Sequence, residues 1–195
     1  MRLVVGLGNP GERYAHTRHN VAWRVLDELA SRGNARPGED GATFRARSAR
    51  TGGHDVVLVQ PLTYMNASGD AIREWQGRYG LDAGEWLVVT DDVYLPLGTL
   101  RLRVSGSSGG HRGLESIEAV VGHRDYARLR VGVGAAESSE ALREHVLEEF
   151  APEEQPVLEE AVRRAADAVE CWLAEGLPAA MNRFNRRVRK EESET

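Results

Sequence analysis

Residues 86–90 read WLVVT, a continuous apolar run that is followed directly by Asp91 and Asp92. A run of this kind is typical of a strand that is buried on both faces of an α/β sheet. Residues 2–7, RLVVGL, form a second short β-rich run, after which Gly8 breaks the pattern. Both runs predict strands of one sheet, and the carboxylates at the end of the first run mark a candidate site.

Further segments along the chain alternate between strand and helix patterns. Strands are predicted over 44–50, 55–60, 99–104 and 127–133, and helices over 17–31, 68–79, 114–121, from 152–156 to about 174, and over 178–184. Thr17 is the expected cap of the first helix. The alternation predicts one three-layer α/β/α domain over residues 1–185, with a mixed, mostly parallel twisted sheet. The charged residues 186–195 are expected to form a disordered tail.

Composition restricts the possible functions. The net charge of −5 over 195 residues argues against a general nucleic-acid coat protein, although one small basic patch could still bind nucleic acid. No apolar run reaches the ~18 residues of a membrane span, and glycine and proline break the N-terminal run, so we expect neither an anchor nor a signal peptide. The single Cys171 excludes an internal disulfide and suits the cytoplasm.

The N-terminal glycines match a dinucleotide-binding pattern, G-x-G-x-x-G, over residues 6–11. Such a fold needs an acidic residue at the end of a second strand ~20 positions later, whereas Asp27 and Glu28 fall inside a predicted helix. Pro10 also removes a backbone donor from the loop. We therefore expect no dinucleotide, although a tight turn alone would not explain Asn9 at the end of a strand.

Five segments stand out by their order and spacing. They read GLGNPGERYAHTRHN (6–20), PLTYMNASG (61–69), VVTDDVYLPLG (88–98), GSSGGHRGL (106–114) and RLRVGVG (128–134). Together they span most of the chain and resemble the bacterial peptidyl-tRNA hydrolase family. The resemblance implies an enzyme that cuts the ester between a peptide and its tRNA, and so recycles tRNA from peptidyl-tRNA dropped by ribosomes or trapped on large ribosomal subunits.

The resemblance implies that His19 is the general base and that Asp91 is its acidic partner. The residues fit these roles, because a neutral imidazole accepts a proton from water and a carboxylate can orient the ring. His19 also lies at a predicted helix start, where the helix dipole disfavours the imidazolium. Asp92 is the rival of Asp91, and only one of the two can face the ring because neighbouring strand residues point in opposite directions.

Other site residues follow from the same resemblance. Asn9 is implied in separating N-blocked from free aminoacyl substrates, and Asn66 lies by the base, where its amide could stabilise an oxyanion. Tyr14 and Tyr64 match positions that contact the tRNA end. His111 matches a histidine that binds or positions substrate, with no catalytic step. Arg112 departs from the asparagine common in the family, and as a fixed cation it could reach a phosphate or the peptide.

The resemblance places Arg101, Arg103 and Arg130 near the 5′ phosphate of the tRNA. Arg101 and Arg103 share one face of a predicted strand, so they could form a local anion site with Arg130 alongside. The C-terminal Arg183, Arg186, Arg187 and Arg189 could add diffuse attraction.

We expect no metal and no cofactor, because an activated ester is cut without one and neither an HExxH nor a paired-cysteine pattern occurs. A cytoplasmic monomer is the working expectation. The main alternative is a non-catalytic RNA-binding relative with the same fold, a reuse known from chloroplast splicing.

Overall fold

The computed structural model describes residues 2–82, 84–135 and 141–185, and within these ranges seven strands form one sheet. Their order is β2-β3-β4-β1-β5-β7-β6. The strands are β1 (Arg2–Gly6), β2 (Arg36–Pro37), β3 (Phe44–Thr51), β4 (His54–Pro61), β5 (Trp86–Asp92), β6 (Leu100–Arg103) and β7 (Ala127–Gly132). The predicted tail, 186–195, lies outside the described residues.

The sheet is mixed, as predicted. The four central strands, β4, β1, β5 and β7, run parallel, whereas β2, β3 and β6 pair antiparallel at the two edges. Parallel neighbours need a crossover, and helices provide it here. Every residue of β5 is buried, which agrees with the apolar run that predicted it.

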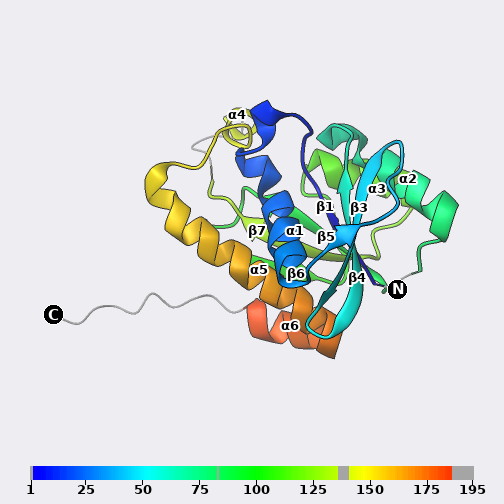
Figure 1. The fold of residues 1–195 in the computed structure, drawn as a ribbon. Coiled ribbons are helices and arrows are strands. Elements are labelled where there is room, and N and C mark those ends of the chain that lie inside the picture. Colours follow the sequence, from blue (N-terminus) through cyan, green and yellow to red (C-terminus); the bar gives the residue numbers. More distant parts are fainter. Residues whose placement is uncertain (1, 83, 136–140, 186–195) are drawn as a thin grey trace.

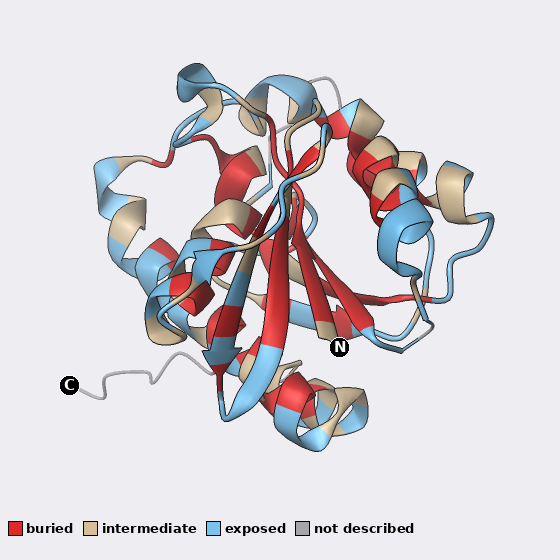
Figure 2. Cartoon of the chain, turned by 45° about the vertical axis from the view of Figure 1, so that its right-hand side comes forward, coloured by how far each residue is buried: buried red, intermediate tan, exposed pale blue. Residues whose placement is uncertain are grey.

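Helices cover both faces of the sheet (Figure 1). One face packs against α1 (Val21–Arg32), α5 (Gln155–Glu175) and α6 (Leu177–Phe184), and the other against α2 (Ser68–Tyr79) and α3 (Arg112–Val121). Figure 2 shows the buried central strands between these layers. The predicted three-layer α/β/α architecture is therefore confirmed. None of the helices in the described ranges combines the length and apolar character needed to cross a bilayer.

The first helix begins later than predicted. Residues Glu12–Tyr14 and Arg18–Asn20 form the short 3-10 turns η1 and η2, and α1 begins only at Val21. Thr17 does not cap it, because its hydroxyl donates to Tyr14 O at 2.9 Å. The backbone N–H groups of Arg18 and His19 instead donate to Glu148 O and Val146 O, just after the one-turn helix α4 (Leu142–His145). A tertiary backbone contact has thus replaced the first turn of the predicted helix.

The N-terminal glycines serve packing. A Cβ at Gly6 would lie 2.7 Å from Leu26, and a Cβ at Gly8 would lie 2.6 Å from the ring of Trp23. Both contacts are with α1, so the glycines let this helix approach the end of β1. Close helix packing accounts for Gly6 and Gly8, and a φ of 103° accounts for Gly11, so the pattern needs no dinucleotide to explain it.

Candidate active site

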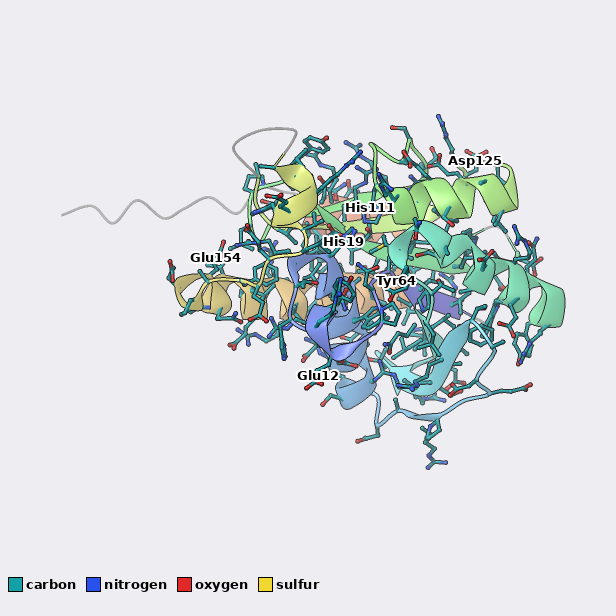
Figure 3. All side chains as sticks on the ribbon, turned by 90° about the horizontal axis from the view of Figure 1, so that it is seen from above. Glu12, His19, Tyr64, His111, Asp125 and Glu154 are labelled. Atoms are coloured by element: carbon teal, nitrogen blue, oxygen red, sulfur yellow. The ribbon has the colours of Figure 1, made fainter. Side chains whose placement is uncertain are left out.

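A cavity of about 480 Å³ opens at the carboxyl ends of the parallel strands. Residues that line it include His19, Asn66, Asp91, Arg112 and Arg130, which come from five different elements, and His111, which directly precedes α3. Strand ends of a parallel sheet meet at one edge, which is why residues so far apart in sequence gather there. In Figure 3 the labels of His19, His111 and Tyr64 lie in one region, whereas Glu12, Asp125 and Glu154 mark the periphery.

His19 contacts Asp91 directly. Its Nδ1 lies 2.8 Å from Asp91 Oδ1, and the two side chains are 13% and 1% exposed. A carboxylate accepts, so Nδ1 carries the proton and Nε2 is left as the basic nitrogen. Asp92 faces elsewhere: its Oδ1 accepts from Tyr94 N at 2.8 Å and its Oδ2 lies 3.3 Å from Arg130. The structure therefore brings Asp91, and not Asp92, to the histidine.

His111 approaches the same carboxylate oxygen from the other side. Its Nδ1 accepts from the backbone N–H groups of Gly113 and Leu114 at the start of α3. The proton of a neutral ring must therefore sit on Nε2, which lies 2.9 Å from Asp91 Oδ1 and 2.7 Å from the hydroxyl of the buried Thr90. Both ring nitrogens of His111 are thus engaged within the protein.

The shared carboxylate changes the titration of the site. Burial alone would raise the pKa of Asp91, but the two histidine rings hold this pKa well below its ordinary value. Burial would likewise lower the pKa of His19, but the charge of Asp91 and its hydrogen bond raise this pKa above the ordinary 6.5. The helix dipole is expected to disfavour the imidazolium, but the net shift of the His19 pKa is upward, because the carboxylate of Asp91 lies only 2.8 Å away.

Asn9 is buried and fixed by three hydrogen bonds. Its backbone N–H donates to Asn20 Oδ1 at 2.8 Å, its carbonyl accepts from Asn20 Nδ2 at 2.9 Å, and its Oδ1 accepts from Met65 N at 2.8 Å. The side-chain N–H₂ of Asn9 is therefore the group left for a ligand. Sequence reasoning assigned no role to Asn20, although it belongs to the TRHN segment, because only the fold brings it to Asn9.

The remaining polar and aromatic residues lie around the cavity. Asn66 is exposed in the 3-10 turn η3 (Met65–Ala67), and its side chain forms no hydrogen bond within the described ranges. The rings of Tyr14 and Tyr64 meet edge to face, with centroids 6.3 Å apart, and Tyr64 is 60% exposed. Neither tyrosine lines the cavity, so they form a separate aromatic surface beside η1 and η3.

The predicted arginine cluster is brought together only in part. Arg101 lies opposite Arg130 in the pairing of β6 with β7, and both Arg101 and Arg103 are exposed. Arg130 turns toward the cavity and binds Asp92 and Ser107 O. Arg183 is paired with Glu175 at 2.9 Å, and Arg186, Arg187 and Arg189 lie outside the described residues.

One group of possible metal ligands occurs among the described residues. It comprises His19, Asp91 and His111, whose candidate ligand atoms lie within 4.8 Å of one another. His19 Nδ1 and His111 Nε2 are already occupied, because each of them contacts Asp91 Oδ1. A cation would have to displace both contacts, so the donor set fits a hydrogen-bonded proton carrier better than a metal centre.

Known proteins resemble the chain over nearly its whole length. A family profile described as Peptidyl-tRNA hydrolase matches residues 3–193. Proteins named peptidyl-tRNA hydrolase from Syntrophomonas wolfei and Roseiflexus castenholzii are 43% and 48% identical, over 95% of this chain and 100% and 87% of their own lengths. The crystal structure of peptidyl-tRNA hydrolase from Acinetobacter baumannii superposes with a TM-score of 0.88 at 33% identity, covering 95% of this chain and 94% of that one.

Proposed function

The chain belongs to the peptidyl-tRNA hydrolase family and hydrolyses peptidyl-tRNA, and from this premise we propose that His19 is its general base. The observation that carries the proposal is the 2.8 Å contact between His19 Nδ1 and Asp91 Oδ1. It holds the ring in the tautomer whose Nε2 can accept a proton. The ring borders the cavity, so water bound there is within reach of a base.

In the proposed reaction, Nε2 of His19 takes a proton from water as the oxygen attacks the ester carbonyl. Asp91 stabilises the resulting imidazolium. The tetrahedral intermediate then expels the ribose oxygen, which takes the proton back from His19. The exposed amide of Asn66 can donate to the oxyanion on the carbonyl oxygen. Protons and charge balance without any group beyond this chain and water.

Asn9 supports selection for a blocked amino group. Met65 N occupies its Oδ1, so Asn9 presents a donor, and a donor suits the carbonyl of an N-acylated residue. A free aminoacyl ester has an ammonium at that place and offers no acceptor. We assign His111 to holding Asp91 and not to contacting tRNA, because both of its ring nitrogens are engaged.

We assign the remainder of the tRNA to surfaces beside the cavity and to Arg130 at its border. Tyr14 and Tyr64 would contact its acceptor end, and Arg101, Arg103 and Arg130 would face its 5′ phosphate. Action as a monomer in the cytoplasm, on peptidyl-tRNA dropped by or trapped on ribosomes, and one domain over residues 1–185 stay predictions.

Release of labelled peptide from an N-blocked aminoacyl-tRNA tests the assignment of the base. Wild type should turn over, and His19→Ala should bind tRNA with unchanged affinity but release no peptide above background. Tight tRNA binding without turnover by the wild type would instead favour the RNA-binding alternative. Turnover by His19→Ala at the wild-type rate would exclude His19 as the base.

A further inference from the structure

Arg112 and Arg143 line the active-site cavity from two different elements. Arg112 is the first residue of α3, Arg143 lies in α4, and both are exposed. Neither side chain forms an ion pair or a hydrogen bond with any residue in the ranges that the structure describes. Arg130, the third arginine of the cavity, is by contrast tied to Asp92 and Ser107 O. Two guanidinium groups therefore face the cavity with no anionic partner among the described residues.

The carboxylates of the cavity do not neutralise this charge. Asp91 is covered by two histidine rings and Asp92 is bound by Arg130, which leaves Glu115 as the one exposed carboxylate among the described lining residues. Glu115 accepts only a long bond from Ser108, at 3.5 Å. The start of α3 adds the positive end of its dipole at Arg112. Among the described residues of this wall, Arg112 and Arg143 outnumber Glu115, in a chain of net charge −5, and this favours an anionic ligand.

The substrate carries one anion at a constant place beside the ester. The phosphodiester that joins the terminal adenosine to the preceding nucleotide lies one ribose away from the bond that is cut, whereas peptide side chains vary. A guanidinium binds phosphate oxygens in pairs, with strong charge-assisted bonds. Tyr94 lines the same cavity and is 67% exposed, and an aromatic ring there suits a nucleobase.

We propose that Arg112 and Arg143 form a phosphate subsite that binds the 3′ strand of the tRNA at the phosphodiester nearest the ester. The proposal rests on the hydrolase function given above and adds the part of the substrate that this wall recognises.

Paired minimal substrates test the subsite. One is an N-acetylated aminoacyl ester of adenosine, which has no phosphodiester, and the other is the same ester of the dinucleotide CpA. Arg112→Gln and Arg143→Gln should each raise KM for the CpA ester about tenfold, the effect expected for one lost charge-assisted contact. KM for the adenosine ester should stay within about twofold of wild type. Arg36→Gln, an exposed arginine on the opposite edge of the sheet, is the matched control and should change neither.

Three outcomes would overturn the proposal: equal rises for both esters, no rise for either, or a rise that appears only when the esterified residue is glutamate and not glutamine. The last would assign the arginines to an acidic peptide side chain. Titration of CpA and of adenosine into wild type and into Arg112→Gln, followed by NMR, measures binding at the subsite without any turnover. If the protein cleaved no ester but bound CpA more tightly than adenosine, and Arg112→Gln removed this preference, the proposed function would be wrong and the phosphate subsite would stand.

Discussion

The side chain of Asn20 binds both backbone polar groups of Asn9, accepting from its N–H at 2.8 Å and donating to its carbonyl at 2.9 Å. Asn20 is completely buried and directly follows His19. The residue next to the proposed base therefore fixes the loop that carries the proposed selector of blocked substrates. The proposed base, His19, and the proposed selector, Asn9, are therefore held in place relative to each other by Asn20.

Asn20→Ala should break this connection. It leaves a buried N–H and a buried carbonyl of Asn9 without partners, which costs about 1–3 kcal/mol of unfolding free energy. The ratio of kcat/KM for N-acetylated over free aminoacyl-tRNA should fall, because the Asn9 donor is no longer held in place. Denaturant unfolding and the two rate measurements check these results. Asn182→Ala, at an exposed position on α6, should change neither, and an unchanged ratio in Asn20→Ala would refute the connection.

Asp91→Asn should lower kcat by at least about a hundredfold, because the imidazolium loses its stabilising charge. The pH profile should also move. In the wild type Asp91 raises the pKa of His19 above 6.5, and the base works when deprotonated, so activity rises with pH through this raised value. Without the carboxylate, burial lowers the pKa, and the acid limb of the kcat profile should shift to lower pH.

Asp92→Asn is the control for that pair of measurements. Asp92 contacts Arg130 and Tyr94 N and has no contact with the histidine among the described residues. It should therefore leave the acid limb in place. A shift in Asp92→Asn, with none in Asp91→Asn, would reverse the assignment of the acidic partner.

Arg101→Glu should weaken recognition of the whole tRNA. Arg101 is exposed opposite Arg130, and reversing its charge should raise KM for full-length peptidyl-tRNA about tenfold or more at low salt. KM for a minimal aminoacyl nucleotide should not change, since that substrate has no 5′ phosphate of the acceptor stem. Arg50→Glu makes the same change on the exposed part of β3 and should have little effect. Equal effects of Arg101→Glu on both substrates would remove the 5′-phosphate assignment.

Gly69→Ala tests the crossing of α2 and α3. An added Cβ would press into the carbonyl oxygen of Ser116, which is backbone and cannot swing aside. We expect a loss of about 1–3 kcal/mol in unfolding free energy, measured by denaturant titration. Gly77→Ala on the same helix meets no atom within 4 Å and should instead stabilise the protein by about 0.5–1 kcal/mol. A stable Gly69→Ala would show that the helices can separate at little cost.

Local patterns predicted most of the elements. Helix α2 has the predicted bounds, Ser68–Tyr79, and the hairpin of β3 and β4 turns at Gly52 and Gly53, whose φ values are 56° and 82°. These features depend on side-chain periodicity and on backbone conformations that few residues adopt, and both can be recognised in the chain itself. The start of α1 could not be recognised, because the backbone groups that replace its first turn belong to residues 146–148.

The two arginines of β7 show the same limit. Arg128 and Arg130 are two residues apart and share a face, yet Arg128 is fully buried and bonded to Ser107 O and Arg124 O, while Arg130 reaches the cavity. Alternation predicts the face of a strand on which a side chain lies. Which part of that face is covered depends on tertiary contacts, here those of Arg128 with Ser107 and Glu118.

The sequence by itself determined the layered α/β fold, the strand end that carries Asp91 and the histidine-bearing segment near it, because hydrophobic period and motif order are local properties. Only the tertiary structure decided that His19 and His111 share one oxygen of Asp91 and that Asn20 binds Asn9. It likewise decided that Arg112 and Arg143 face the cavity with no partner in the part of the chain that the structure describes. These contacts join residues that are far apart in the sequence, such as His19 and His111, which are 92 positions apart. They form because the sheet brings the ends of its parallel strands together.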